Sequence, residues 1–371
     1  MSKRIYEKRK KIIPRVGILI LAVFLTLFVI KAVQVLPILY ELFFKQEITL
    51  KKTNERVNIL LLGIGGGKHD GPNLTDTIIF ASIDPKKKTV SLVSIPRDFW
   101  VPDFNAKINT AYALGENKQK GGGLLLTKAI VEKILGQNVD YALRVDFTGF
   151  VRAVDMIGGL NVTVDRNLDD YEYPIDGKET DTCGFEQEEF EKRATAASQL
   201  DAFPCRYEHL YFEKGLQHMD GETALRFVRS RHATGAEGTD FARSQRQEKI
   251  IQAFKDKVFS AGTFLNPIRV VSLYDIFKDS IDTDIKQEEY DDFIKLARKM
   301  ENAQVHSAVL DEGDPQEKRN GLLTNPIPSK LFDNQWVIIP RRGSGNYTEI
   351  HSYAQCVIET GNCEVFPPII E

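Results

Sequence analysis

The 371-residue chain has few cysteines, histidines and tryptophans and almost no excess of charge, with four Cys, six His, two Trp and a formal net charge of -3. A charge this close to zero argues against bulk nucleic-acid binding, which depends on a strongly basic surface. The cysteines fall into two pairs along the sequence, Cys183 with Cys205 and Cys356 with Cys363. Neither pair has the two-residue spacing or the nearby histidines of a structural zinc site, which disfavours such a site. The length is sufficient for one large domain or two modest ones with a buried core.

A glycine-rich stretch from Leu61 to Thr77, LLGIGGGKHDGPNLTDT, lacks the residues that define a nucleotide-binding loop. A P-loop requires Ser or Thr after its Gly-Lys pair, and His69 stands there instead. The dinucleotide fingerprint would require glycine at the position of Lys68. Both kinds of nucleotide site are therefore excluded at this loop.

The N-terminus joins a basic cluster to a long apolar run. Residues 1–15 carry seven Lys and Arg against one Glu, and Val16 to Ile30 has no charge. Apolar residues continue past Lys31, so the segment is long enough to cross a bilayer of about 30 Å. A cleaved signal peptide begins in the same way, but no small-x-small cleavage site follows. We therefore favour an uncleaved, single-pass anchor with a cytoplasmic N-terminus and an extracytoplasmic C-terminal domain.

The four cysteines form two plausible disulfides, Cys183 with Cys205 and Cys356 with Cys363, which suit an oxidising compartment. Four unrelated thiols are the alternative, because spacing alone does not fix connectivity. The prediction of disulfides agrees with an extracytoplasmic location.

Apolar patterns after the anchor predict interleaved helices and strands, as in an α/β or α+β sheet domain. Strands are expected at 57–63, 77–84, 89–96, 141–147 and 160–165, and helices at 109–114, 123–135, 148–159, 221–231, 240–260, 270–277 and 288–300. Residues 166–214 carry thirteen acidic and six basic side chains and show little periodicity, which predicts a solvated insertion. The last seventy residues contain one expected strand, in QWVIIPR, and a cysteine pair.

These patterns divide the chain into a basic tail (1–15), an anchor (16–40), a stalk (41–56), a main domain (57–300) and a C-terminal extension (301–371) that we expect to pack on the main domain.

The glycine-rich loop leads to two carboxylates, Asp70 and Asp76, at the end of a predicted strand. Mg²⁺ is commonly held by one or two carboxylates together with substrate phosphate oxygens. A plain surface loop rich in turn-forming Asp and Asn is the alternative. The loop by itself does not decide between them.

Arginines in three separate segments favour an anion site. They are Arg97 beside Asp98, then Arg226, Arg229 and Arg231, then Arg243 and Arg246 with Gln247 following. Guanidinium groups bind phosphate in a fork geometry, and gathering several of them is costly unless an anion completes the site. The alternative is a solvated basic face paired with the acidic insertion.

In their order along the chain, several motifs resemble the LytR-CpsA-Psr family of bacterial envelope proteins. The matching pieces are NILLLG, TDTIIFASID, SLVSIPRD, KIN at Lys107 to Asn109, DMIGGLNVTVD, GLQHMDGETALRFVRSRH and DFARSQRQ, after a basic N-terminus with one span. The likeness covers about Val57 to Ser260. Several linked motifs in one order are far more specific than a single pattern.

The resemblance implies an α/β fold, a mixed sheet flanked by helices, with a deep apolar pocket for a polyprenyl tail and arginines at its mouth. Apolar positions between Ile78 and Ile157 are expected to line this pocket. Family members are understood as transferases that move a glycopolymer from a polyprenyl pyrophosphate carrier to a peptidoglycan hydroxyl and form a phosphodiester. The implied partners are therefore the lipid-linked glycan, peptidoglycan and the membrane, and no nucleic acid.

Carried over residue by residue, the resemblance implies that Asp76 binds Mg²⁺. Arg97, Arg229, Arg231 and Arg243 would grip the pyrophosphate, Lys107 and Asn109 would brace that cluster, and Arg226, Arg246 and Gln247 would extend it. Many family members have an aspartate where this chain has Gly65, and Asp70 is the candidate substitute. Asp98 and Asp76 are candidate bases for the accepting hydroxyl, although for Asp98 an ion pair that steers Arg97 is the favoured interpretation.

Two other functions fit the same residues. A pyrophosphatase would use water as the acceptor in place of a sugar hydroxyl. A regulatory, lipid-binding protein of the envelope (a transcriptional attenuator) is a second alternative, although the domain would lie across the membrane from the genome.

Overall fold

The computed structural model describes residues 48–67, 71–196, 198–259, 280–314 and 318–367. The predicted anchor at 16–40 and the predicted helix at 270–277 lie outside these residues. Among the helices that are described, none is both long and apolar enough to span a membrane. The chain separates into a small unit, Met1–Leu50 with Lys286–Arg298, and a large unit, Lys51–Ile285 with Lys299–Glu371.

The small unit contains helix α11 (Tyr290–Lys299), which the periodicity predicted. The carboxylate of Asp292 accepts hydrogen bonds from the backbone N–H and the hydroxyl of Thr49, at 2.9 and 2.6 Å. These bonds fasten the chain just after the undescribed N-terminal segment to the helix.

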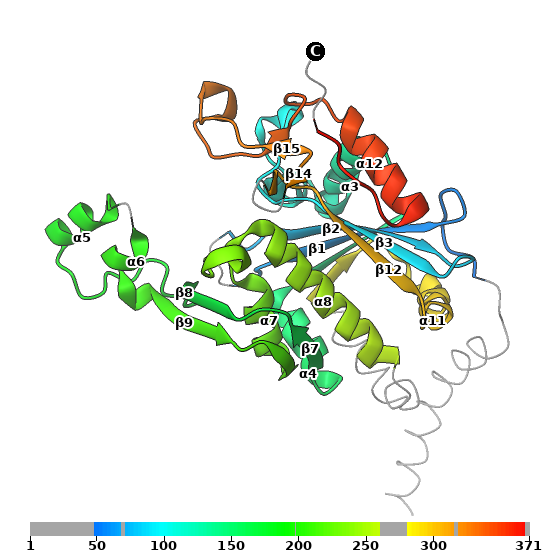
Figure 1. The fold of residues 1–371 in the computed structure, drawn as a ribbon, viewed down its shortest axis with the longest axis horizontal. Helices are drawn as coiled ribbons and strands as arrows, with labels where there is room; N and C mark the ends of the chain where they lie inside the picture. Colours follow the sequence, from blue (N-terminus) through cyan, green and yellow to red (C-terminus); the bar gives the residue numbers. More distant parts are fainter. Residues whose placement is uncertain (1–47, 68–70, 197, 260–279, 315–317, 368–371) are drawn as a thin grey trace, which may run out of the picture. The chain divides into compact units, whose positions relative to one another are not determined.

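The large unit is built on a six-stranded mixed sheet (Figure 1). Its strands lie in the order β11 (Ile281–Thr283), β6 (Tyr141–Asp146), β1 (Val57–Ile64), β2 (Thr75–Asp84), β3 (Thr89–Ser94) and β12 (Gln304–Val309). The pairs β1–β6 and β3–β12 are parallel and the other neighbours are antiparallel. A central mixed sheet flanked by helices agrees with the fold class that the resemblance implied.

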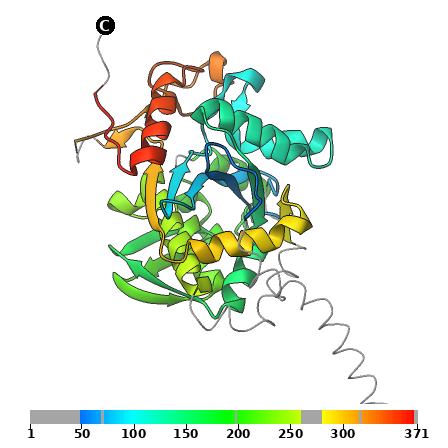
Figure 2. The same ribbon diagram turned by 90° about the vertical axis from the view of Figure 1, so that its right-hand side faces the viewer.

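Both faces of this sheet are buried at its centre, which explains why β1 and β2 are nearly continuous apolar runs. Leu60, Leu62 and Phe80 pack toward helices α3 (Gly122–Leu135) and α12 (Thr348–Thr360). The intervening Leu61, Ile79 and Ala81 belong to a cluster on the other face that includes Ile251 of α8 (Asp240–Phe259). Figures 1 and 2 show α8 on one side of the sheet and α3 and α12 on the other.

A second hydrophobic core lies on the side of α8 that faces away from the central sheet. It joins α4 (Phe147–Met156), α7 (Gly221–Arg229), the pair β7 (Leu160–Val164) and β10 (Gly215–Met219), and the pair β8 (Leu168–Pro174) and β9 (Tyr207–Phe212). Phe227 of α7 and Ile250 of α8 are both buried in it. Helix α8 therefore packs between two hydrophobic cores and fixes α7 relative to the sheet.

The insertion at 166–214 is an ordered hairpin, where the sequence predicted only a solvated segment. Strands β8 and β9 pair, and helices α5 (Gln187–Ala194) and α6 (Gln199–Ala202) follow one another in the segment that connects the two strands. A disulfide between Cys183 and Cys205, with a Cα–Cα distance of 5.6 Å, links the two ends of this helical segment. The register shifts between Asp170 and Tyr173, which breaks the alternation that would have revealed β8.

The C-terminal residues 301–371 contribute β12 to the central sheet and α12 to its cover, and the sequence predicted neither element. A second disulfide, Cys356–Cys363, joins α12 to the segment after it, with a Cα–Cα distance of 6.0 Å. The strand expected in QWVIIPR is only β16 (Ile339–Pro340). The other short elements are β4 (Trp100–Val101), β5 (Ala106–Lys107), α2 (Ala111–Lys118), β13 (Gly313–Asp314), β14 (Arg319–Asn320) and β15 (Leu323–Thr324).

Replacing Cys183 and Cys205 together by serine should loosen the tip of the β8–β9 hairpin, because a cross-link across a loop of this size contributes about 3 kcal/mol. Limited proteolysis of the full chain should then cut between β8 and β9 at lower protease concentrations. The matched control, Cys356→Ser with Cys363→Ser, should leave cleavage at the hairpin unchanged. Equal resistance of the hairpin in the first variant and the native protein would contradict this role.

Candidate active site

The candidate site begins at the edge of the sheet where β2 starts and β3 ends. The two strands are antiparallel, so Asp76 on β2 and Arg97 just after β3 lie at the same edge. Their side chains form an ion pair between Arg97 Nη1 and Asp76 Oδ1. The backbone N–H of Ile95 donates to Ile78 O at 2.9 Å and fixes the turn that carries Arg97.

Asp98 is a buried carboxylate that gathers three cations. It is 5% exposed. Its carboxylate oxygens lie 2.7 Å from Lys107 Nζ, 3.4 Å from Arg97 Nε and 3.9 Å from an Arg231 guanidinium nitrogen. These cations come from the turn after β3, from β5 and from the segment after α7, so one side chain links three parts of the chain.

The charges around Asp98 keep it ionised. Burial acts to raise the pKa of Asp98, but the hydrogen bond from Lys107 and the charges of Arg97, Lys107 and Arg231 outweigh it, and the pKa lies below its ordinary value. A carboxylate with a lowered pKa is a weak proton acceptor. This geometry favours the ion-pair role of Asp98 over the role of a base.

Arg229 lies in the last turn of α7, whose N-terminus is capped by Asp220. Its side chain is 13% exposed, and its guanidinium pairs bidentately with Asp176, which follows β8, at 2.8 and 3.0 Å. The guanidinium also lies 4.7 Å from the ring centroid of Phe147. Burial would lower the pKa of Arg229, but Asp176, Tyr173 and Asp76 raise it, so it stays charged. An acidic side chain of the insertion thus occupies the fork of a predicted phosphate ligand.

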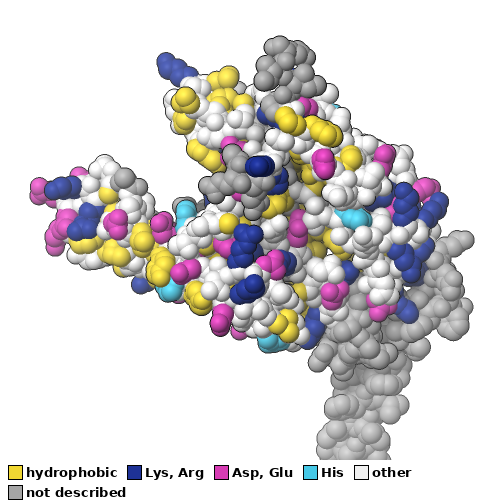
Figure 3. Space-filling view, viewed as in Figure 1, with side chains coloured by type: hydrophobic (Ala, Val, Ile, Leu, Met, Phe, Trp, Pro, Cys, Tyr) yellow, Lys and Arg dark blue, Asp and Glu magenta, His cyan; other side chains and the backbone are white. Residues whose placement is uncertain are grey.

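The first turns of α8 bring two further predicted residues to the same edge. Gln247 Nε2 donates to the hydroxyl of Thr77, next to Asp76, at 2.9 Å. Arg243 is 6% exposed and lines the same cavity as Asp76. The positions are four apart on one face of the helix. Figure 3 shows Lys and Arg side chains gathered near the middle of this face of the molecule, where α8 begins.

Arg226 and Arg246, both predicted to extend the phosphate site, have other partners. Arg226 pairs with Glu208 of β9 at 2.5 Å. Arg246 is 2% exposed, and its guanidinium donates to the carbonyl oxygens of Phe227 at 3.0 Å and Ser230 at 2.7 Å. Because those carbonyls flank Arg229, Arg246 holds the end of α7 in place and acts on the cluster indirectly.

Two predicted residues remain, Asn109, which lies at the site, and Asp70, which lies outside the described residues. The backbone N–H of Asn109 donates to Arg97 O at 3.2 Å, and its buried Oδ1 has no hydrogen-bond partner among the described residues. Asp70, the candidate second metal carboxylate, falls in 68–70, outside the described part of the chain. Asp70 stays a prediction as the substitute for the aspartate that many family members have at the position of Gly65.

A cavity of about 380 Å³ opens beside Asp76. The expectation that it would be a deep apolar pocket lined by residues between Ile78 and Ile157 is wrong for this cavity. From that range it has only Ile78, Ser94, Ile95 and Pro96. Most of its wall comes from the start of α8 and from the C-terminal residues 309–314, 319, 336 and 338, and many of these are charged.

Comparison with known proteins decides the family. The model of the LytR_cpsA_psr family matches residues 41–329. The chain belongs to the LytR_cpsA_psr family.

Curated relatives of this LytR_cpsA_psr chain carry transferase names. It is 28% identical over 236 residues to the polyisoprenyl-teichoic acid–peptidoglycan teichoic acid transferase TagV of Bacillus subtilis, covering 62% of this chain and 50% of TagV. It is 27% identical over 289 residues to TagU of Bacillus cereus, covering 76% of this chain and 77% of TagU. The match thus spans only half the length of the first relative.

Solved structures show the same LytR_cpsA_psr fold. The crystal structure of B. subtilis TagV superposes with a TM-score of 0.52 at 23% identity and covers 83% of this chain and 99% of that one. The protein gbs0355 from Streptococcus agalactiae superposes with a TM-score of 0.54 at 20% identity, covering 82% and 88%.

Sequence reasoning missed Asp176 and Phe147, which both contact Arg229 in this LytR_cpsA_psr domain. Asp176 is one of thirteen acidic residues in the insertion, and nothing in its local sequence marks it. Phe147 begins α4 and belongs to an apolar pattern that reads as core. Only the fold brings them to the arginine.

Asp98→Asn should lower the free energy of unfolding by about 3 kcal/mol at neutral pH, because three partly buried cations lose the buried counter-charge that they share. The pKa of Asp98 is lowered on folding, so this stabilisation is present above the ordinary pKa of 3.8 and is lost as the pH falls through the lower folded value. Urea unfolding at about pH 7 and about pH 3 measures the gap between variant and native protein. A gap that stays the same at both values would contradict the charge-based role.

Proposed function

We propose that this protein is a transferase that moves a glycopolymer from a polyprenyl pyrophosphate carrier to a peptidoglycan hydroxyl. The observation that carries the proposal is the convergence of Arg97 and Arg231 on Asp76 and Asp98, with Arg243 lining the cavity beside Asp76. Family membership and the names of TagV and TagU as teichoic acid transferases support it.

The guanidinium groups would bind the pyrophosphate oxygens and stabilise charge as the phosphoanhydride bond breaks. The acceptor hydroxyl oxygen attacks the phosphorus that bears the glycopolymer and loses its proton. A phosphodiester forms, and polyprenyl phosphate leaves with the bridging oxygen. The cleaved phosphoanhydride drives the transfer, so no nucleotide is required.

The pyrophosphate must compete with Asp176 for Arg229. In the structure the Asp176 carboxylate occupies both arms of the Arg229 fork, and its side chain is 59% exposed. A pyrophosphate carries more negative charge than one carboxylate, and the Asp176 side chain has solvent beside it. We propose that Asp176 keeps the buried guanidinium paired until the substrate replaces it.

Asp76 at the sheet edge is the candidate magnesium ligand. In the ion pair between Arg97 and Asp76, the guanidinium contacts the carboxylate oxygen Oδ1. In the described chain, Asp76 belongs to no group of three acidic, His or Cys side chains at ligand distance. One carboxylate with substrate phosphate oxygens and water is a common Mg²⁺ arrangement. We propose Asp76 as the protein ligand; the ion would supply positive charge beside the phosphate oxygens.

We also propose that an N-terminal anchor holds the domain on the outer face of the membrane. The basic residues at 1–15 and the apolar run that follows support this topology. The two disulfides suit the oxidising side. Such a tether would keep the site near the lipid carrier.

Arg97→Ala and Arg229→Ala should each lower transfer about 100-fold or more, because each removes a charged donor aimed at the reacting phosphate. The assay incubates the full chain in detergent with Mg²⁺, a polyprenyl pyrophosphate-linked glycan and peptidoglycan, and measures wall-linked and free glycan separately. Circular dichroism should show intact folds.

Lys249→Ala is the matched control, since Lys249 on α8 pairs with Asp165, which is not one of the candidate site residues. The activity of this variant should equal that of the native chain. Near-native transfer by both arginine variants would refute the site. Free glycan as the sole product of the native chain would point to the pyrophosphatase.

Chelation with EDTA should abolish transfer, and added Mg²⁺ should restore it, if Asp76 holds the ion against the phosphate. Asp76→Asn should raise the Mg²⁺ concentration for half-maximal activity by about tenfold or more, since a neutral amide is a weaker ligand. Full activity in EDTA, or an unchanged Mg²⁺ requirement in the variant, would remove the metal from the proposal.

A further inference from the structure

The hairpin of β8 and β9 turns one face to solvent, and that face carries aromatic rings. The pairing register sets the two faces, since Leu168 and Leu210 are buried in the core and their neighbours along each strand point outward. The outward side chains are Asp169, Tyr171, His209 and Tyr211. Tyr171 and Tyr211 are 51% and 50% exposed. We call Tyr171, His209 and Tyr211 the aromatic strip.

The rings of the aromatic strip hold one another in place. The Tyr171 and His209 rings stack with their centroids 4.1 Å apart and their planes 6° apart, and the Tyr211 ring centroid lies 6.3 Å from that of His209. Asp169 Oδ1 lies 2.6 Å from His209 Nε2 and fixes the imidazole. The register shift places two residues, Tyr171 and Glu172, opposite His209. Rings that are fixed in advance lose little side-chain entropy when a ligand packs on them.

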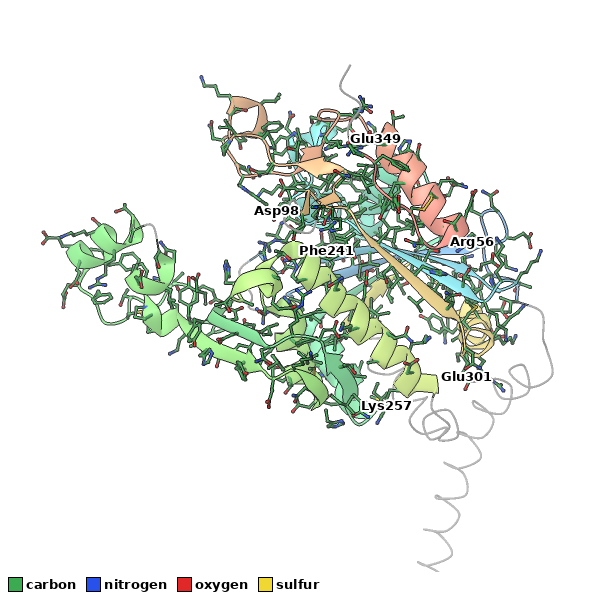
Figure 4. The ribbon with its side chains drawn as sticks, viewed as in Figure 1. Arg56, Asp98, Phe241, Lys257, Glu301 and Glu349 are labelled. Atoms are coloured by element: carbon green, nitrogen blue, oxygen red, sulfur yellow. A yellow bond between two sulfur atoms is a disulfide. The ribbon has the colours of Figure 1, made fainter. Side chains whose placement is uncertain are left out.

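The base of the hairpin is fastened to the end of α7, which carries Arg229. Asp176, just after β8, fills the fork of Arg229. The hydroxyl of Ser230 donates to the carboxylate of Asp170 on β8 at 2.6 Å. Figures 1 and 4 show the hairpin running outward from the region of Asp98. A polymer held on the aromatic strip is thereby kept close to the proposed transfer site and gains effective concentration there.

The charge of the insertion limits what the aromatic strip can bind. Residues 166–214 carry thirteen acidic and six basic side chains, so their negative field repels a chain of phosphates or an anionic bilayer surface. Each of the three rings carries a polar atom, and Asp169 adds a carboxylate whose side chain is 32% exposed. These groups favour an uncharged ligand that is rich in hydrogen-bonding groups over an apolar one.

A chain of sugars satisfies both requirements. The C–H faces of sugar rings pack on the negative faces of aromatic rings, and their hydroxyl and N-acetyl groups bond to carboxylates and imidazoles. On the face shown in Figure 3, hydrophobic side chains (Tyr among them), His and acidic side chains lie together along the hairpin. The chemistry of this surface is therefore that of a glycan-binding platform.

We propose that the aromatic strip binds the glycan strand of peptidoglycan, a chain of N-acetylated sugars, and so presents the accepting hydroxyl to the transfer site. The inference rests on the proposed function, because it assigns a place to the acceptor of that reaction. The donor is held through its phosphates by the arginines, and the acceptor is held on a separate surface. Damage to the aromatic strip therefore weakens acceptor binding and leaves the chemistry at the arginines intact.

The test titrates the full chain in detergent with the hexamer of N-acetylglucosamine and, separately, with poly(glycerol phosphate). The native chain should bind the hexamer and not the polyanion. Tyr171→Ala combined with Tyr211→Ala should weaken hexamer binding about tenfold, because two packing faces are lost. Tyr171→Phe combined with Tyr211→Phe should keep most of the affinity, since the rings remain. In the transfer assay the alanine pair should raise the KM for peptidoglycan about tenfold and leave kcat unchanged.

Leu216→Ala is the control, because Leu216 is 73% exposed on β10 and lies outside the aromatic strip, and it should match the native chain in both assays. Hexamer binding that is absent from the native chain, or that the alanine pair retains in full, would overturn the inference. Binding of the polyanion that the alanine pair loses would assign the aromatic strip to a phosphate polymer and also overturn it. Hexamer binding needs no transfer, so a native chain that binds the hexamer through the aromatic strip but transfers nothing would refute the proposed function and leave the glycan-binding surface standing.

Discussion

The candidate site depends on one buried negative charge. Asp98 is 5% exposed, and Lys107, Arg97 and Arg231 surround its carboxylate. Like charges brought this close would repel one another, and the buried carboxylate offsets that repulsion while it fixes where each cation stands. Arg97 and Arg231, two of the predicted phosphate ligands, are positioned in this way. The residue that the sequence offered as a possible base is better understood as the centre of the anion-binding cluster.

The packing of α7 and α8 carries this arrangement into the fold. Arg246 of α8 donates to two backbone carbonyls at the end of α7, so the helix pair behaves as one support for Arg229 and Arg231. Ile250 and Ile251 of the same helix are neighbours in sequence and pack into different cores. The packing of α8 thereby fixes the end of α7, with Arg229 and Arg231, relative to the edge of the sheet that carries Asp76.

Much of the central fold could be predicted, because its causes are local. The apolar runs of β1, β2 and β3 and the periodicity of α3, α7 and α8 reflect burial directly. β12 and α12 were missed, since β12 is a short strand with polar Gln304, His306 and Ser307, and its identity comes from pairing in parallel with β3. The hairpin of the insertion was hidden by its register shift at Asp170.

The sequence pointed to residues of the candidate site but not to most of the contacts that they make. Charge type, order along the chain and the family resemblance pointed to Asp76, Arg97 and Arg229 as candidates. No local pattern could tell that Arg246 bonds to backbone carbonyls or that Asp176 fills the fork of Arg229, because both depend on contacts between segments distant in sequence. The polar wall of the cavity was unforeseen for the same reason, since about a third of its residues come from Val309 and the chain after it.

A crystal structure of the full chain with farnesyl diphosphate and Mg²⁺ tests the central claim most directly. The account predicts both phosphates within hydrogen-bond distance of Arg97, Arg229 and Arg231, with Asp98 still paired to Lys107 and with Asp176 displaced from Arg229. A diphosphate bound elsewhere, while the Arg229–Asp176 pair stays intact, would contradict it.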